Sequence, residues 1–103
     1  MSITTSTVTS AGNIVYTSSG NTAITWLSLN NWGPSNVTVN LFVVPNTGNA
    51  DTSTQVYYSL PLASGDTYQI YAANEKLLLD NGDSVQVDST GNTVTAVTSY
   101  TSV

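Results

Sequence analysis

Few groups in this 103-residue chain can do acid–base chemistry. The chain has six carboxylates and Lys76, but no Arg, His or Cys. A glycosidase needs two carboxyl groups that face each other across a cleft. Asp66, Asp80, Asp83 and Asp88 instead fall at expected strand ends and turns, where an Asp side chain caps its own backbone. We therefore expect a protein that is not an enzyme, with no catalytic residue and no cofactor.

The segment Asp80-Asn81-Gly82-Asp83 resembles part of a calcium-binding loop. It lacks the regularly spaced carboxylates and the final Glu that such a loop uses as ligands. Asn-Gly between two apolar runs is also the strongest short signal for a β-hairpin, because both central residues must take a positive φ. The sequence therefore predicts a hairpin here and no metal site.

Charge is scarce: 7% of the residues are charged, and the net charge is −5. Nucleic-acid binding requires several Lys or Arg side chains to displace counterions from phosphates. An anionic membrane surface attracts basic segments for the same reason. The composition therefore predicts no nucleic-acid partner and no membrane partner.

The segment that organises the expected fold is Asn36 to Val44. Its first half alternates apolar and polar residues, as a half-buried strand does, while Phe42 and Val44 make its second half apolar on both faces. We expect the central strand of a sheet. Similar alternation places Ile24 and Trp26 off the core face of the strand Thr22 to Asn30. In the strand Gln55 to Leu62 it places Tyr57 off the core face. The residues on the core face of that strand are Val56, Tyr58, Leu60 and Leu62.

Eight or so short strands, separated by turn residues every eight to twelve positions, indicate an antiparallel β-sandwich. We predict a single all-β domain over residues 13–103, Ig-like or jelly-roll-like, with at most one helical turn, near Ala72 to Lys76. Residues 1–12 form a polar N-terminal arm or an edge strand. The stretch Ser2 to Ser10 buries little beyond Ile3 and Val8, so we expect it to be disordered alone and to become ordered against a neighbouring subunit.

Four aromatic residues lie off the expected core face or in a loop: Trp26, Trp32, Tyr57 and Tyr71. Such side chains stack on sugar rings, anchor protein interfaces, or simply pack in a second layer. Trp32, in a Gly-Pro loop, is the expected apolar anchor beside the arm. The predicted interface residues are Ile3, Val8, Trp26, Trp32, Tyr57 and Tyr71.

From about Val15 to Tyr100 the sequence resembles small virion structural proteins of tailed bacteriophages, especially those of cyanophages. Four segments, in order and evenly spaced, carry this resemblance: Val15 to Thr25, Val39 to Pro45, Ala63 to Tyr68 and Glu75 to Asp83. The resemblance implies a β-sandwich accessory protein of the capsid or tail, located in the virion. It implies no ligand residues, and Trp32 lies outside the four segments.

The expectation that follows is a capsid decoration (cement) protein, which docks on the assembled shell and bridges its subunits. Its partners would be the major capsid protein or other virion proteins, and it would form a homo-oligomer. Two alternatives remain: an accessory structural protein of the tail or neck, and a carbohydrate-binding β-sandwich module.

Overall fold

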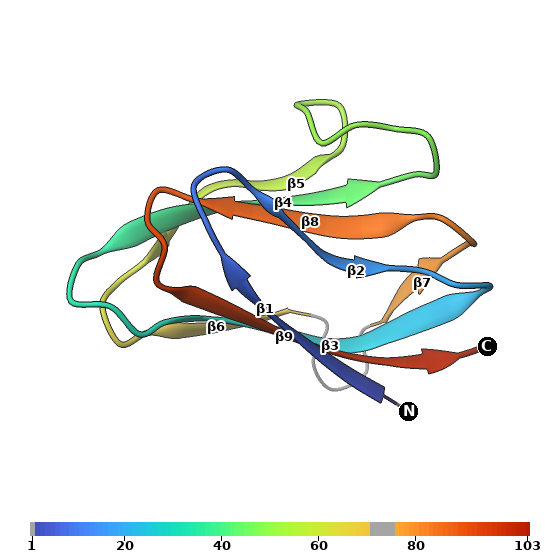
Figure 1. Cartoon of the computed structure of the whole chain (residues 1–103), viewed down its shortest axis with the longest axis horizontal. Helices are drawn as coiled ribbons and strands as arrows, with labels where there is room; N and C mark the ends of the chain where they lie inside the picture. Colours follow the sequence, from blue (N-terminus) through green and yellow to red (C-terminus); the bar gives the residue numbers. More distant parts are fainter. Residues whose placement is uncertain (1, 71–75) are drawn as a thin grey trace.

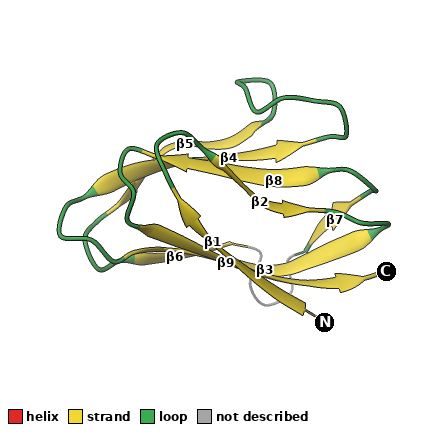
Figure 2. Cartoon of the chain, in the orientation of Figure 1, coloured by secondary structure: helices red, strands yellow, loops and turns green. Residues whose placement is uncertain are grey.

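The computed structural model describes residues 2–70 and 76–103, which form two antiparallel β-sheets packed face to face (Figure 1). The described residues contain strands and loops but no helix (Figure 2). The strands are β1 (Ser2–Val8), β2 (Asn13–Thr17), β3 (Thr22–Asn31), β4 (Val37–Val44), β5 (Gln55–Leu62), β6 (Thr67–Ile70), β7 (Leu77–Leu79), β8 (Ser84–Ser89) and β9 (Val94–Ser102). The prediction of an all-β sandwich is confirmed. The predicted helical turn near Ala72 to Lys76 lies, except for Lys76, outside the described residues.

The order of the strands is that of a jelly roll. Sheet A has the order β1-β9-β3-β6, and β7 also pairs with β3; sheet B has the order β2-β8-β4-β5. Both β6 and β7 run antiparallel to β3, along different parts of it, so they form one divided strand. Counted in this way, sheet A joins the first, eighth, third and sixth strands, and sheet B joins the second, seventh, fourth and fifth. This is the double Greek-key arrangement of jelly rolls, and it decides between the two sandwich types predicted.

The hairpin predicted at Asn81-Gly82 is wrong. The turn itself forms: Gly82 has φ +88°, and the Asp83 amide donates to the Asp80 carbonyl at 3.1 Å. However, β7 before the turn belongs to sheet A, and β8 after it belongs to sheet B. The turn residues fix where the chain reverses, whereas packing between the sheets decides which strand each arm joins.

The central strand predicted around Val37 to Val44 is confirmed. Strand β4 lies between β8 and β5, and it pairs with both. Val39 and Leu41 are fully buried between the sheets. Phe42 and Val44 are buried on the other side of the strand, where the loop of residues 45–54 brings Ala50 beside Phe42. The second half of β4 is therefore covered on both faces.

Two bulges overturn the predicted faces of neighbouring strands. The register of β3 against β9 shifts between Ile24 and Trp26, so that Ile24 turns into the core and is fully buried. The register of β4 against β5 shifts between Val39 and Leu41, opposite Ser59, whose φ is +51°. An extra residue in a strand inverts the alternation beyond it.

Of the two possibilities predicted for residues 1–12, an arm or an edge strand, β1 is an edge strand of its own domain. Strand β1 pairs with β9 along its whole length, from Ser2 opposite Tyr100 to Val8 opposite Val94. Val8 is fully buried in the core, whereas the side chain of Ile3 is 69% exposed. The expectation that this stretch is disordered alone is therefore wrong: its backbone pairing orders it although its side chains bury little. Deleting residues 2–10 would also remove a core side chain.

Candidate functional site

Among the described carboxylates, that of Asp83 stabilises the turn that contains it. Among residues 2–70 and 76–103 there is no group of three His, Cys, Asp or Glu side chains that could hold a metal ion. The carboxylate of Asp83 accepts hydrogen bonds from the Asn46 amide at 2.8 Å and the Asp80 amide at 2.9 Å. Asn81 Oδ1 accepts from the Gly20 amide at 2.9 Å. These bonds join three loops, which accounts for the Asp-Asn-Gly-Asp segment as a structural turn.

Asp88 has a similar structural role in sheet B. Its carboxylate accepts a hydrogen bond from Asn40 Nδ2 at 2.7 Å, and Asn40 Oδ1 accepts one from the Ser59 amide at 2.8 Å. Asn40 thereby ties the bulge in β5 to β8. A carboxylate held in this way is a fixed acceptor on the outer side of sheet B.

The structure separates the aromatic residues that the sequence grouped together. Tyr57 faces the core, against the expectation, because the bulge at Ser59 turns it inward. Its ring centroid lies 5.8 Å from that of Tyr68, in an edge-to-face arrangement. Tyr71 lies outside the described residues. Among the predicted interface residues, Val8 and Tyr57 therefore belong to the core rather than to an exposed surface.

The same bulge exposes an aromatic side chain that the alternation placed in the core. Tyr58 is 75% exposed at the β5 edge of sheet B. The sequence signal that could have revealed it is Pro61, which cannot donate a ladder hydrogen bond and so points to an irregular edge strand.

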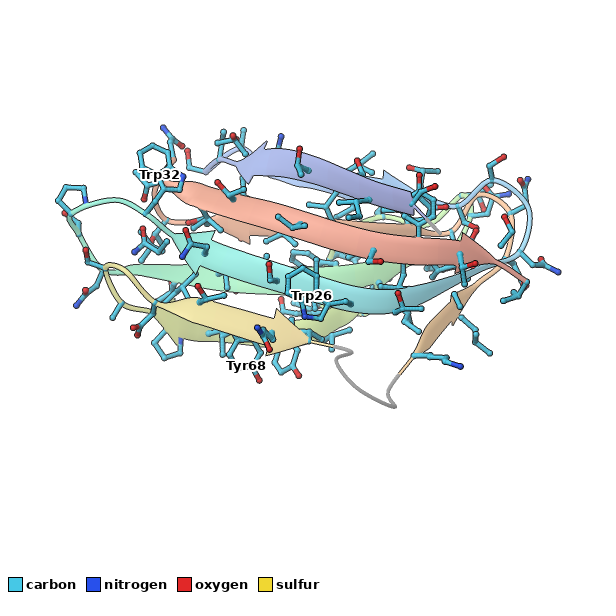
Figure 3. The ribbon with its side chains drawn as sticks, turned by 90° about the horizontal axis from the view of Figure 1, so that it is seen from below. Trp26, Trp32 and Tyr68 are labelled. Atoms are coloured by element: carbon cyan, nitrogen blue, oxygen red, sulfur yellow. The ribbon has the colours of Figure 1, made fainter. Side chains whose placement is uncertain are left out.

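Ile3, Trp26 and Trp32 all lie on the outer face of sheet A, where Figure 3 labels the two tryptophans. We call this surface the A face. It consists of the outward side chains of β1, β9, β3, β6 and β7, together with Trp32, which directly follows β3. The strand members are Ile3, Thr5, Thr7, Ala23, Thr25, Trp26, Ser28, Asn30, Thr67, Gln69, Leu78, Thr95, Val97, Ser99 and Thr101.

The strands of the A face carry no charge, and they present both polar and apolar side chains. None of the residues in the five strands of sheet A is charged. At one end, rows of hydroxyl and amide side chains cross the sheet; for example, Thr7 lies opposite Thr95, and Thr95 opposite Asn30. Toward the other end lie Trp26 and the exposed Leu78, whose side chain is 70% accessible.

Trp26 lies between the part of β3 that pairs with β6 and the part that pairs with β7. Strand β6 pairs with Leu27 to Asn30 and β7 with Thr22 to Ile24, so neither pairs with Trp26. The bulge beside Thr25 lies at the same point. The side chain of Trp26 remains half-buried on the A face, as Figure 3 shows from outside.

Trp32 is held by a rigid frame centred on Asn31, which is fully buried. Asn31 Nδ2 donates to the Ser35 carbonyl at 2.8 Å and to the Leu62 carbonyl at 3.0 Å. Its Oδ1 accepts from the Gly33 amide at 3.1 Å and from Thr93 Oγ1 at 2.8 Å. The Trp32 amide also donates to the Thr93 carbonyl, while the Trp32 side chain remains 59% exposed.

Gly33 is required in this frame. A Cβ at this position would lie 2.6 Å from the Thr93 side chain, closer than real Cβ contacts. The sequence showed Trp32 as a loop aromatic, but it did not show that Asn31 and Gly33 fix its position.

Sheet B bears two shallow hollows, one of about 210 Å³ on its outer side and one of about 260 Å³ beside Thr38 and Pro61. The first is the more polar region. Its walls include Ile14, Phe42, Gln86 and Asp88. Gln86 Nε2 donates to Ser84 Oγ, and Asp88 is occupied by Asn40. Two polar side chains of this wall thus already have partners within the protein.

Comparisons with known proteins give no match to a family model, to a curated protein or to a solved structure. None of the described residues belongs to a helix long and apolar enough to cross a membrane.

Proposed function

We propose that this protein is a structural protein of a phage virion, most plainly a capsid decoration (cement) protein that docks through the A face on an assembled shell. The observation that carries the proposal is an uncharged sheet face that holds both tryptophans of the chain. Burying an unpaired charge in an interface costs several kcal/mol, roughly 2–5 when one partner of a pair is missing. A face without charges avoids that cost on any closely fitting surface.

The tryptophans supply the apolar anchors of such a contact. Trp and Tyr are enriched among the residues that dominate binding energy at interfaces. Trp32 stands exposed on its fixed loop, and Trp26 lies roughly 20 Å away along β3, at about 3.3 Å per residue. Two anchors at this separation, with hydroxyl and amide groups around them, suit a flat protein surface.

Stabilisation of the shell would follow from mass action. A protein that binds only assembled subunits favours assembly, by an amount that depends on its concentration relative to its dissociation constant. The scarcity of charge also suits display in many neighbouring copies, since like charges on adjacent copies would repel one another. The partner in this proposal is the major capsid protein; a tail or neck component would use the same face on another virion protein.

A carbohydrate-binding module is the second candidate, because jelly rolls also serve as lectin domains. The positions of the aromatic side chains favour docking to protein instead. Sugar stacking needs aromatic side chains gathered on one platform, whereas Trp26 and Trp32 lie far apart on the A face and Tyr58 lies at the edge of the other sheet. A glycan array is expected to give no hits that vanish on Trp→Ala substitution.

The test is to count the copies of the protein on particles of the phage that encodes it. Particles are prepared with the wild type, with Trp26→Ala/Trp32→Ala, and with Tyr58→Ala as the matched aromatic control on sheet B. Loss of one central Trp typically costs about 2 kcal/mol or more of binding energy, roughly 30-fold in affinity. We expect reduced occupancy for the double variant alone, by cryo-EM and quantitative mass spectrometry. Full occupancy of the double variant, or no copies of the wild type on particles, would contradict the proposal.

A further inference from the structure

The four edges of the two sheets are protected to different degrees. The β5 edge of sheet B contains Pro61 and the bulge at Ser59. The β2 edge is five residues long, with a register shift between Ile14 and Tyr16. The far edge of sheet A is divided between β6 and β7. Proline, bulges and short strands are the devices by which sheet edges avoid pairing with other chains.

Strand β1 has none of these devices. Its seven residues pair with β9 in one unbroken register, and they include no proline, no glycine and no charged side chain. Alternate N–H and C=O groups of an edge strand point away from the sheet and can pair with another strand. The molecule thus leaves one long, regular and uncharged strand edge open.

We propose that β1 pairs antiparallel with β1 of a second copy of this chain, about a two-fold axis at Thr5. The two A sheets then become one continuous sheet. This inference does not depend on what the A face docks to, so it stands apart from the proposed function.

The sequence of β1 suits pairing with itself. In the proposed register Thr5 lies opposite Thr5 of the second copy, and Ile3 lies opposite Thr7. Each such pair joins two outward side chains, as the sheet pleat requires. Thr–Thr cross-strand pairs are favourable, whereas like charges directly opposite each other are not. Two molecules with a net charge of −5 can therefore meet along a strand that carries no charge.

The same geometry limits the assembly to two copies. A two-fold contact uses the same edge in both molecules, so that no β1 edge remains open after pairing. The other edges are the three protected ones. Continued growth into a filament would need a second unprotected edge, which the described strands do not offer.

Single-cysteine variants test the register directly, because the chain has no cysteine of its own. Directly opposed residues in an antiparallel pair have Cα atoms about 4.5–5.5 Å apart, within disulfide range. Thr5→Cys is therefore expected to form a disulfide-linked dimer under mild oxidation. Two copies of Ile3→Cys would lie four residues out of register, about 13 Å apart, and should not cross-link with each other.

A mixture of Ile3→Cys and Thr7→Cys should cross-link, since these positions lie opposite each other. Thr67→Cys, an exposed position on β6 at the far edge of the same sheet, is the control for random collision. Cross-linking of Thr5→Cys no faster than that of Thr67→Cys would overturn the proposal. So would equal cross-linking of Ile3→Cys with itself.

A charge exchange supplies an independent measurement. Thr5→Lys and Thr5→Glu each place like charges across the proposed axis, and each should weaken the dimer by about fivefold in sedimentation analysis. Mixing the two variants should give a heterodimer with about the affinity of the wild-type dimer. Thr67→Lys should leave the affinity of the dimer unchanged. A wild type that is monomeric at every concentration would overturn the proposal. If β1 amides gained exchange protection only on particles, β1 would pair with a foreign strand instead, which would also overturn it.

Discussion

Sheets A and B are built from similar residues, but they treat their surroundings differently. The strands of sheet A carry no charged residue, and its β1 edge is regular. Sheet B brings the loop of residues 45–54 beside Phe42 and interrupts its β5 edge with a bulge and a proline. The single charged residue among the strands, Asp88, also belongs to sheet B. Composition alone does not separate the two sheets; a few irregular residues do.

The bulges of the two sheets lie on different kinds of strand. In sheet B the bulge at Ser59 lies on an outer strand, where it disturbs pairing with other molecules. In sheet A the bulge beside Thr25 lies on an inner strand, where it turns a side chain and leaves the β1 edge unaltered. The irregular residues therefore fall on an edge strand in sheet B and on an inner strand in sheet A.

The largest expected effect tests whether the bulges set the faces. Ile24→Ala removes a fully buried side chain and should lower the free energy of unfolding by about 2–5 kcal/mol. Tyr58→Ala removes a larger side chain that is exposed, and should change this free energy by no more than about 0.5 kcal/mol. Denaturant unfolding of both variants measures the difference. Unbroken alternation along both strands would give the reverse order.

These two strands also show how far the sequence could lead. The pattern of β4 was sufficient to predict a central strand, because burial on both faces requires apolar residues on both sides of its second half. The face of Ile24 could not be predicted, because one extra residue inverts the alternation and no residue type announces it. For Tyr57, Pro61 indicates an irregular edge strand but does not locate the bulge. Turn residues located the reversal at Gly82 but not the exchange of sheets, which depends on contacts between distant strands.

The candidate site, too, could be predicted from the sequence only in part. Trp26 and Trp32 were predicted to lie outside the core, and the structure places both on the A face. The arm was predicted from its lack of apolar side chains, yet β1 is held by backbone pairing with β9, which side-chain composition does not report. The hydrogen bonds that fix the Trp32 loop depend on Asn31, and no sequence pattern singled out that residue.

A second, smaller effect compares one asparagine in each sheet. Asn31→Ala, at the end of sheet A, removes four hydrogen bonds and leaves the buried carbonyl of Leu62 without this partner. We expect a loss of about 2–4 kcal/mol in unfolding free energy, since an unpaired buried group costs about 1–3 kcal/mol. Asn40→Ala, in sheet B, affects half-buried groups and should cost about 1 kcal/mol.

Thermal unfolding of the two asparagine variants gives this order, and the fluorescence of Trp32 adds a local measurement. The emission of the Asn31→Ala variant should shift as the loop loses its frame, whereas that of Asn40→Ala should match the wild type. Equal stability of the two variants would mean that the Trp32 loop is held by other contacts. The rigid presentation of the A face would then lose its support.

The smallest expected effect concerns the loop of residues 45–54 beside sheet B. The Asp51 carboxylate accepts hydrogen bonds from Ser53 Oγ at 2.5 Å and from the Ser53 amide at 2.8 Å. The bond from the Ser53 side chain is the main reason that the pKa of Asp51 lies below its ordinary value of 3.8, and the bond from the Ser53 amide adds to it. A carboxyl group whose folded pKa is depressed stabilises the fold above its unfolded pKa, and this contribution is lost as the pH falls through the folded pKa. Acid should therefore loosen this turn at a pH below 3.8, while β1 and β9, which contain no carboxylate, keep their signals. An NMR titration of the Ser53 amide measures the midpoint, and Asp51→Asn should abolish the transition. A midpoint at or above 3.8 would show that Ser53 does not hold the carboxylate in solution. The loop of residues 45–54 beside Phe42 would then lack this stabilising contact.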